Sequence, residues 1–378
     1  MTDNELELGE ICALSNRYGR DSNYVIAGGG NTSYKNDDTL WIKGSGVSLA
    51  EITKDGFVAM DRAKLAAVWD KAKRGMYPDA PEAAVLAEMM AAKKPGQEDK
   101  RPSVETLLHD MLPFTYVVHT HPALINGMCC GKNGEKTAAS LFGAGALWIP
   151  ASDPGFVLAA AVQKKLEGAQ RIPSILLLQN HGIFAAANDS RGIDAIYRDV
   201  SAALAEKIIK TAAFGPPLTE YRESETIGAS LARAASAEAA SPRSASFVRN
   251  DEYARLVSDR AVFEAAAVPF TPDHIVYAGS DPLFIERGKD IAEAFNKHCA
   301  SRGRAPKIAA YQGLGIFGIG VNKKSAVTAL ELFDDWIKVG IYAESFGGPL
   351  PMSREKIDFI NNWEAEHYRA KLNEQKQQ

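Results

Sequence analysis

The pattern of apolar and polar positions divides the chain into segments of helical and of extended character. Apolar residues recur at helical spacing in six segments, so we expect helices at 4–18, 61–74, 81–93, 104–111, 155–168 and 190–213. Short apolar runs, several of them rich in β-branched or aromatic residues, predict strands at 23–26, 39–43, 115–121 and 175–178. Helices that alternate with strands are typical of a layered α/β domain.

The stretch 223–247 breaks this pattern. It is rich in Ala, Ser, Glu and Arg and has few large apolar residues, which predicts a linker that is partly helical at most. We therefore expect three parts, which are an α/β domain at 1–222, a linker at 223–249 and a smaller C-terminal α/β domain at 250–378.

An internal repeat connects the two domains. The segment 313–318 has the GxGxxG spacing of dinucleotide-binding loops, but such a loop opens a helix directly, whereas these glycines lead into a strand-like segment. A repeat explains them better, because QNHGIF at 179–184 aligns with QGLGIF at 312–317, an offset of 133 residues (312 − 179). The second domain therefore resembles a degenerate partial copy of the second half of the first, with Leu314 at the position of His181.

Three histidines give the strongest chemical signal. His119 and His121 lie at positions i and i+2 at the end of an expected strand, so their side chains point to the same face. His181 follows the apolar strand at 175–178. Three imidazoles that leave a fourth position open form the ligand set of a catalytic zinc site. The alternative is three separate histidines, each hydrogen-bonded in the core or at the surface.

Three short segments could bind a phosphate group. Gly30-Asn31-Thr32-Ser33 and Gly44-Ser45-Gly46 are expected to be loops after strands, where backbone N–H groups and hydroxyls can face an anion. Ser103 is expected to open a helix, whose N-terminus favours negative charge. Each segment also has a purely structural interpretation, as a glycine turn or as a helix N-cap.

Glu105 lies in the first turn of the helix that Ser103 is expected to open. The helix dipole stabilises a carboxylate there, which is a sufficient structural reason for its presence. If the helix points at the metal, Glu105 could instead move a proton beside a carbonyl group that the metal polarises. His109, one helical turn further on, could orient Glu105.

Composition and charge limit the classes of partner. With 46% hydrophobic and 24% charged residues, the 378-residue chain has ordinary globular values. Its net charge of −4 argues against nucleic acid and anionic membranes as main partners. The acidic N-terminus has no apolar signal-peptide core, and no apolar run is long enough to span a bilayer. The four cysteines form neither a disulfide framework nor a CxxC pair, which favours free thiols and a cytoplasmic location.

The chain resembles the class II aldolase/adducin family through five motifs that occur in the family's order between about residues 5 and 220. These motifs are Gly30-Asn31-Thr32-Ser33, Lys43-Gly44-Ser45-Gly46, Pro102-Ser103-Val104-Glu105, His119-Thr120-His121 and Asn180-His181-Gly182. The C-terminal portion is similar to the aldolase half of bifunctional rhamnulose-1-phosphate aldolase/lactaldehyde dehydrogenases. A short-chain dehydrogenase domain follows in those proteins, and we expect none within these 378 residues.

The resemblance implies a layered α/β/α fold with a central, mainly antiparallel sheet. It implies that His119, His121 and His181 bind Zn²⁺ or another divalent transition metal, with Glu105 as the catalytic acid/base and perhaps a fourth ligand when no substrate is bound. The residues implied for phosphate binding are Asn31, Ser45, Gly46 and Ser103. Smaller members of the family often carry a second serine where this chain has Val104. The family also forms rings with sites between subunits, so a homo-oligomer, a tetramer in particular, is expected.

The expected function is that of a metal-dependent aldolase, a carbon–carbon lyase of carbohydrate metabolism. It would cleave a ketose 1-phosphate, similar to rhamnulose 1-phosphate, into dihydroxyacetone phosphate and an aldehyde. A sugar-phosphate epimerase, dehydratase or decarboxylase on the same scaffold is one alternative, because these reactions share a metal-stabilised enediolate. A non-catalytic adducin-like module is another, although a binding scaffold has no need of three metal ligands.

Overall fold

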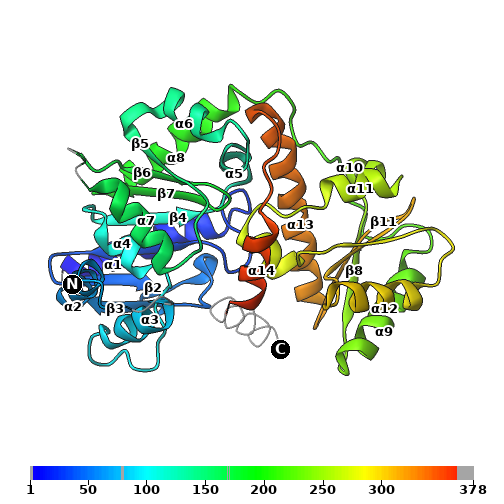
Figure 1. Ribbon diagram of the computed structural model, residues 1–378, viewed down its shortest axis with the longest axis horizontal. Coiled ribbons are helices and arrows are strands. Elements are labelled where there is room, and N and C mark those ends of the chain that lie inside the picture. Colours follow the sequence, from blue (N-terminus) through cyan, green and yellow to red (C-terminus); the bar gives the residue numbers. More distant parts are fainter. Residues whose placement is uncertain (1–2, 78–80, 168, 170, 364–378) are drawn as a thin grey trace. The chain divides into compact units, whose positions relative to one another are not determined.

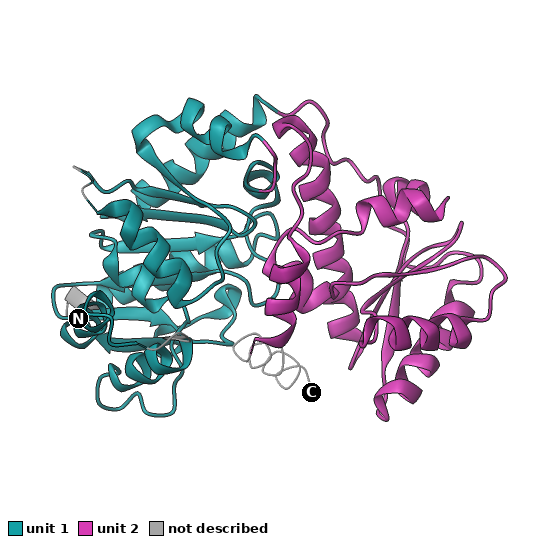
Figure 2. Cartoon of the chain, in the orientation of Figure 1, with its two compact units in different colours: residues 1–129, 133–207 teal, residues 130–132, 208–378 magenta. Residues whose placement is uncertain are grey.

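Two β-sheets organise the chain in the computed structural model, which describes residues 3–77, 81–167, 169 and 171–363 (Figure 1). The chain divides into two compact units, which Figure 2 shows in different colours. The first unit comprises residues 1–129 and 133–207, and the second comprises residues 130–132 and 208–378. The change from one unit to the other at 207–208 therefore precedes the domain end that the sequence predicted at residue 222.

A seven-stranded sheet forms the centre of the first unit. Its strands are β1 (Asn31–Lys35), β2 (Thr39–Lys43), β3 (Phe57–Asp61), β4 (Tyr116–Thr120), β5 (Ala146–Ile149), β6 (Ile175–Leu178) and β7 (Gly182–Ala187). Their spatial order is β3-β2-β1-β4-β7-β6-β5, and every neighbouring pair is antiparallel except β5 and β6. The mainly antiparallel sheet expected from the sequence is confirmed.

Helices cover both faces of this sheet. They are α1 (Asp3–Gly19), α2 (Arg62–Lys73), α3 (Pro81–Ala91), α4 (Thr106–Met111), α5 (Ala123–Cys129), α6 (Gly134–Phe142), α7 (Phe156–Leu166) and α8 (Ser190–Ala205), with short 3₁₀ turns η1 (Leu49–Glu51), η2 (Lys54–Gly56) and η3 (Gly143–Gly145). Strand alternation separates the faces. Thr32 and Thr120 point to one face, where they bond Ser15 of α1 and Tyr197 of α8. Residues at the intervening positions, such as Val117, point to the other face.

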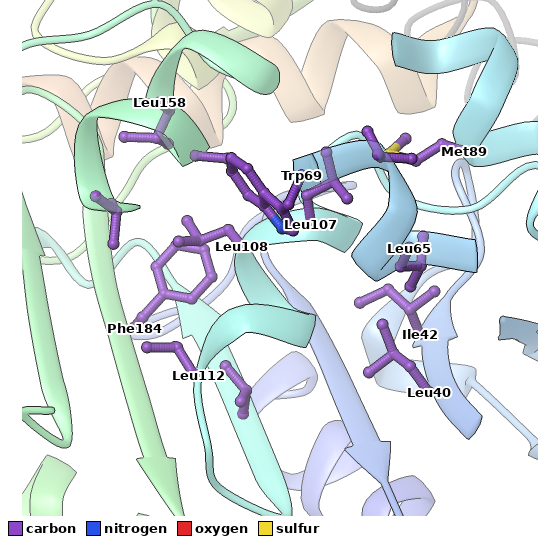
Figure 3. Close-up of a cluster of buried hydrophobic side chains, with 14 of the residues drawn as sticks. Leu40, Ile42, Leu65, Trp69, Met89, Leu107, Leu108, Leu112, Leu158 and Phe184 are labelled. Carbon is purple, nitrogen blue, oxygen red and sulfur yellow. The ribbon is translucent and has the colours of Figure 1, made fainter. Parts of the chain in front are cut away.

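An apolar cluster of the first unit fills this other face, beneath α2, α3, α4 and α7 (Figure 3). Leu40 and Ile42 of β2 meet Leu65 of α2, and Leu107 of α4 lies in the same cluster. Burying one such side chain contributes roughly 1.5–3 kcal/mol to the free energy of unfolding. Phe184 of β7 belongs to the cluster too, and the candidate site begins at its ring.

The second unit has a four-stranded sheet of its own. Its strands are β8 (Ser244–Val248), β9 (Leu283–Ile285), β10 (Ile308–Tyr311) and β11 (Gly315–Gly320), in the spatial order β8-β11-β10-β9. The helical segments are α9 (Ser224–Ala239), α10 (Asp251–Leu256), α11 (Arg260–Ala266), the π-helical turn η4 (His274–Ala278), α12 (Ile291–Arg302), α13 (Lys323–Ala343), the 3₁₀ turn η5 (Glu344–Phe346) and α14 (Arg354–Asn362). Phe317 and Ile319 share an apolar cluster with α9 and α12, whereas Gly318 between them faces α13.

The topology of the second sheet matches that of β4-β7-β6-β5 in the first unit. In both, the outer strand pair is parallel and is linked by one helix, α7 or α12. In both, the chain then turns through a hairpin, β6–β7 or β10–β11, and enters a long helix, α8 or α13. This match supports the duplication expected from the sequence. It also excludes the dinucleotide loop, because the glycines at 313–318 lie in a hairpin and β11 rather than at the start of a helix.

The predicted linker at 223–249 is wrong. Residues 224–239 form α9, and residues 244–248 form β8, which pairs with β11. The composition was misleading for a physical reason. Alanine is the strongest helix former, and Ala234 and Ala235 pack into the core beside Ile227 and Leu231 without large side chains.

Two further expectations need correction. Residues 23–26 form a turn and irregular chain rather than a strand, and the first strand begins only at Asn31. The helix expected at 190–213 ends at Ala205. Among the described residues, none of the helices combines the length and the apolar character needed to cross a bilayer.

Candidate metal centre

Strand β4 places the first two histidines. His119 lies within the strand, and His121 follows it directly, so both imidazoles point to the face that carries α4. The backbone N–H of His121 donates to Tyr24 O at 3.0 Å, which fixes the end of the strand. Space around the pair is tight, because a Cβ atom on Gly182 would lie 2.5 Å from Thr120 O and 2.7 Å from His121 Cδ2. Only glycine fits at position 182.

The hairpin between β6 and β7 places His181. Asn180 adopts a left-handed backbone with φ of 58°, a conformation that asparagine tolerates better than most residues. The backbone N–H of His181 donates to Leu178 O at 3.2 Å and closes the turn. Because β7 pairs directly with β4, this turn brings His181 beside His119.

The three imidazoles converge through their Nε2 atoms. His119 Nε2 lies 2.9 Å from His121 Nε2 and 3.3 Å from His181 Nε2. His119 Nδ1 donates to Ile183 O at 2.9 Å, so in the neutral ring the lone pair of Nε2 faces the other two rings. The His119 ring also stacks on Phe184, with ring centroids 4.0 Å apart, which holds its orientation. The expected histidine cluster is therefore present.

Glu105 reaches the same point from the start of α4. Its Oε2 lies 3.5 Å from His119 Nε2, and its Oε1 lies 3.7 Å from His181 Nε2. The residue is buried at 5% exposure, and Oε1 has no hydrogen-bond partner within the described part of the chain. A buried carboxylate oxygen without a donor is costly unless a cation or a substrate proton satisfies it.

A chain of buried side chains holds Glu105 from the other side. Asn31 Nδ2 donates to Glu105 Oε2 at 2.6 Å, and Asn31 Oδ1 accepts a short hydrogen bond from His109 Nε2. His109 Nδ1 in turn accepts from the Ser33 hydroxyl at 2.7 Å. Lys35 Nζ donates to His109 O at 2.7 Å. Asn31, Ser33 and Lys35 alternate along β1 and therefore share the face that carries α4.

Burial determines the charge states of the side chains in this hydrogen-bonded network. Burial lowers the pKa of His109 well below its usual value, and the nearby Lys35 and His119 lower it further. A neutral His109 that donates from Nε2 and accepts at Nδ1 fits both of its ring contacts. Burial also lowers the pKa of Lys35 to about 7, with Asp110 opposing and Arg62 adding to the shift. His109 thus orients Glu105 through Asn31, and not by direct contact.

The residues predicted to bind phosphate lie close to the hydrogen-bonded side chains that hold Glu105, but two of the reasons for choosing them were wrong. Residues 31–33 are not a loop but the start of β1, paired with β4 so that Asn31 opposes His119. Ser103 does not open a helix, because α4 begins at Thr106, and the Ser103 hydroxyl accepts from Glu105 N at 3.3 Å. Phosphate binding by these residues stays a prediction.

The loop that carries Ser45 and Gly46 runs beside the segment before Glu105. Ser45 N donates to Arg101 O at 2.8 Å, and Ser103 N donates to Lys43 O at 3.2 Å. Gly46 has a φ of 75°, which favours glycine at this turn. These contacts place the loop next to Ser103, so the predicted phosphate residues and Glu105 lie in one neighbourhood.

The donor set fits a divalent transition metal. Ligands about 2.0–2.1 Å from a tetrahedral zinc ion lie about 3.3 Å from each other, close to the separations of 2.9 and 3.3 Å between the histidine Nε2 atoms. The bond from His119 Nδ1 to a backbone carbonyl is the support that metal-binding histidines commonly have. His119, His121 and His181 form the group of possible metal ligands found among the described residues.

The chain belongs to the family of the class II aldolase and adducin N-terminal domain. The model of that family matches residues 9–198, which is 190 of 378 residues and just over half of the chain. The match includes all the candidate site residues named above. The family expected from the sequence motifs is confirmed.

Three individual proteins that resemble this chain share 28% or less of its residues over the matched regions. The chain is 28% identical over 300 residues to "Uncharacterized oxidoreductase YuxG" of Bacillus subtilis (strain 168), a match that covers 73% of this chain but only 42% of that protein. The N-terminal class II aldolase domain of a conserved protein from Thermoplasma acidophilum is 24% identical, with a TM-score of 0.45 over 53% of this chain and 92% of that one. An L-fuculose 1-phosphate aldolase is 19% identical, with a TM-score of 0.36 over 55% and 86%.

Proposed function

We propose that the protein is a zinc-dependent aldolase that cleaves a ketose 1-phosphate, similar to rhamnulose 1-phosphate, into dihydroxyacetone phosphate and an aldehyde. One observation carries the proposal, which is the convergence of three histidine Nε2 atoms with both carboxylate oxygens of Glu105 at 2.9–3.7 Å. Membership of the class II aldolase family supports the reaction type. The sugar is the finer part of the proposal and rests on the sequence resemblance alone.

His119, His121 and His181 would hold the metal. A divalent cation bound there supplies positive charge that stabilises the negative charge developing on the substrate oxygens, an effect worth several kcal/mol. The apolar ring of Phe184, stacked on His119, keeps water from one side of the centre. Electrostatic interactions are stronger in such a partly dry site than in bulk water.

Glu105 would return a proton to carbon. Cleavage breaks the bond between C3 and C4 and leaves the electron pair on C3. As the aldehyde forms, the C4 hydroxyl gives up its proton, which Glu105 would accept. A proton must then reach C3. Asn31 holds Oε2 of Glu105, so we assign the transfer to Oε1, the buried oxygen without a hydrogen-bond partner among the described residues.

Ser45, Gly46 and Ser103 would bind the phosphate group, together with the second N–H of the Asn31 amide. The hydroxyls of Ser45 and Ser103 support this assignment, because the backbone bonds between their two segments bring them into one neighbourhood. We also propose that the active form is a homo-oligomer, a tetramer in particular.

A coupled triose-phosphate assay with rhamnulose, fuculose and ribulose 1-phosphates tests the function, run with and without EDTA. We expect a triose phosphate and an aldehyde in equal amounts, loss of turnover on chelation, and recovery with Zn²⁺ or Co²⁺. An epimer or a dehydrated sugar as the product would assign the site to one of the other reactions of the scaffold. Full turnover in metal-free protein would refute the proposal.

A further inference from the structure

The second unit has Arg249 at the position that corresponds to His121 of the first unit. Strands β4 and β8 end at equivalent points, because the last residue of each pairs with the second residue of β7 or of β11. His121 follows β4 directly, and Arg249 follows β8 directly. The N–H of His121 donates to Tyr24 O at 3.0 Å, and the N–H of Arg249 likewise donates to Leu218 O at 2.9 Å. The repeat therefore places an arginine where the first unit has a proposed metal ligand.

The hairpin turn of the histidine site is also reproduced in the second unit. The turns are residues 179–181 in the first unit and residues 312–314 in the second. The N–H of the first turn residue donates to the last residue of β5 or of β9, at 2.9 Å in both units. The middle residue has a left-handed backbone in both, with φ of 58° for Asn180 and 72° for Gly313. The second unit thus retains the backbone framework of the histidine site.

The guanidinium of Arg249 connects the end of β8 to this second turn. Its Nη1 donates to Gly313 O at 3.3 Å and also donates to Leu314 O. Hydrogen bonds from a charged donor are roughly twice as strong as those between neutral groups. The ring of Tyr221 lies against the guanidinium, with its centroid 4.7 Å from Arg249 Cζ, and restricts its movement. A half-buried arginine therefore fixes the turn of the second unit.

We propose that Arg249 performs in the second unit the structural task that the metal ion performs in the first. By the proposed function, on which this comparison rests, a bound cation joins His121 at the end of β4 to His181 in the turn. In the second unit the cation belongs to the chain itself and joins the end of β8 to residues 312–314. The turn of the second unit therefore keeps its position without metal. The positive charge of Arg249 also excludes a metal ion from this framework, because like charges repel each other.

Hydrogen-exchange mass spectrometry of the full chain, with and without EDTA, tests the role of Arg249 at the turn 312–314. Arg249→Met keeps a long side chain but removes its donors, so amide exchange at 312–314 should become at least about tenfold faster. Arg222→Gln is the matched control, because Arg222 Cζ lies 4.9 Å from the centroid of the same Tyr221 ring, and this variant should exchange like the wild type. Exchange at 312–314 that is equal in Arg249→Met and the wild type, or that EDTA accelerates in the wild type, would overturn the proposal.

Zinc content, measured by elemental analysis, tests the exclusion of a metal ion from the second unit. Phe247→His/Arg249→His/Leu314→His places histidines at the three corresponding positions and should bind about two zinc ions per chain. Phe247→His/Leu314→His, which retains Arg249, should bind about one, as the wild type does. A second zinc ion in this control, or none beyond the first in a triple variant with circular dichroism like that of the wild type, would contradict the proposal. A wild type without zinc would refute the proposed function alone, because exchange at 312–314 reports on Arg249 without metal.

Discussion

Asn31 has two possible tasks, and the substitution Asn31→Ala distinguishes them. The sequence assigned it to the phosphate group, whereas the structure shows its amide between Glu105 Oε2 and His109 Nε2. A hydrogen bond to a charged group contributes about 1.5–3 kcal/mol, and each 1.36 kcal/mol corresponds to a tenfold change in rate. If the amide mainly positions Glu105, its loss should lower kcat by about 10- to 150-fold with a smaller change in KM.

The assay is steady-state cleavage of a ketose 1-phosphate, with Ser45→Ala as the matched control. Ser45→Ala removes a hydroxyl predicted to contact phosphate but keeps the backbone bond from Ser45 N to Arg101 O, so it should raise KM and leave kcat nearly unchanged. Asn31→Ala also leaves His109 Nε2–H without its acceptor, so unfolding must be measured in parallel. A rise in KM at constant kcat for Asn31→Ala, as for Ser45→Ala, would refute the positioning role.

Three other predictions address the metal ligands, the acid/base and a buried cation. His181→Leu places at position 181 the residue that the second unit has at Leu314. It should reduce bound zinc, measured by elemental analysis, to a trace, and circular dichroism should show that the metal-free protein is folded. Full zinc content would exclude His181 as a ligand. Glu105→Gln should keep zinc and lose most turnover, and an unchanged kcat would exclude its role as acid/base. Burial lowers the pKa of Lys35 from 10.5 to about 7 in the folded protein, so the unfolded chain binds more protons between these pH values and stability rises with pH there. From pH 7.5 to 8.5 the free energy of unfolding in urea should rise by about 1 kcal/mol more for the wild type than for Lys35→Met. The same pH dependence in both proteins would contradict the lowered pKa of Lys35.

The histidine site was predictable because its geometry is local. Two histidines at i and i+2 of a strand must share a face, and His181 lies in the turn that follows an apolar strand. The pairing of β4 with β7, which brings His181 beside the other two histidines, was the long-range fact that the sequence pattern did not supply. The repeat around Leu314 likewise indicated the hairpin and the helix after it, but not α9 and β8, which lie in the stretch predicted as a linker.

The hydrogen bonds that hold Glu105 in place were not predictable in the same way. Asn31 and Glu105 are 74 positions apart and meet only because β1 pairs with β4 in a particular register. The glycines before Asn31 suggested a loop and hid the start of the strand. No alternation revealed the network, because Thr32 between Asn31 and Ser33 is polar too, and only the structure shows that every residue of the strand is buried.

The second unit has apolar residues at positions that correspond to the histidines of the first unit. Phe317 corresponds to Phe184, and the β8 residue opposite it is Phe247, where β4 has His119 opposite Phe184. Leu314 and Phe247 both lie in the apolar cluster of the second unit. Apolar side chains thus replace two of the three ligands, which explains why the predicted metal chemistry is confined to the first unit.

X-ray absorption spectroscopy of the zinc-loaded protein tests the central claim most directly. We predict one zinc per chain with three imidazole nitrogens at about 2.0–2.1 Å, and a loss of this signal in His181→Leu. A shell of oxygen ligands without imidazole, or zinc far below one equivalent after loading, would contradict the assignment of these three histidines.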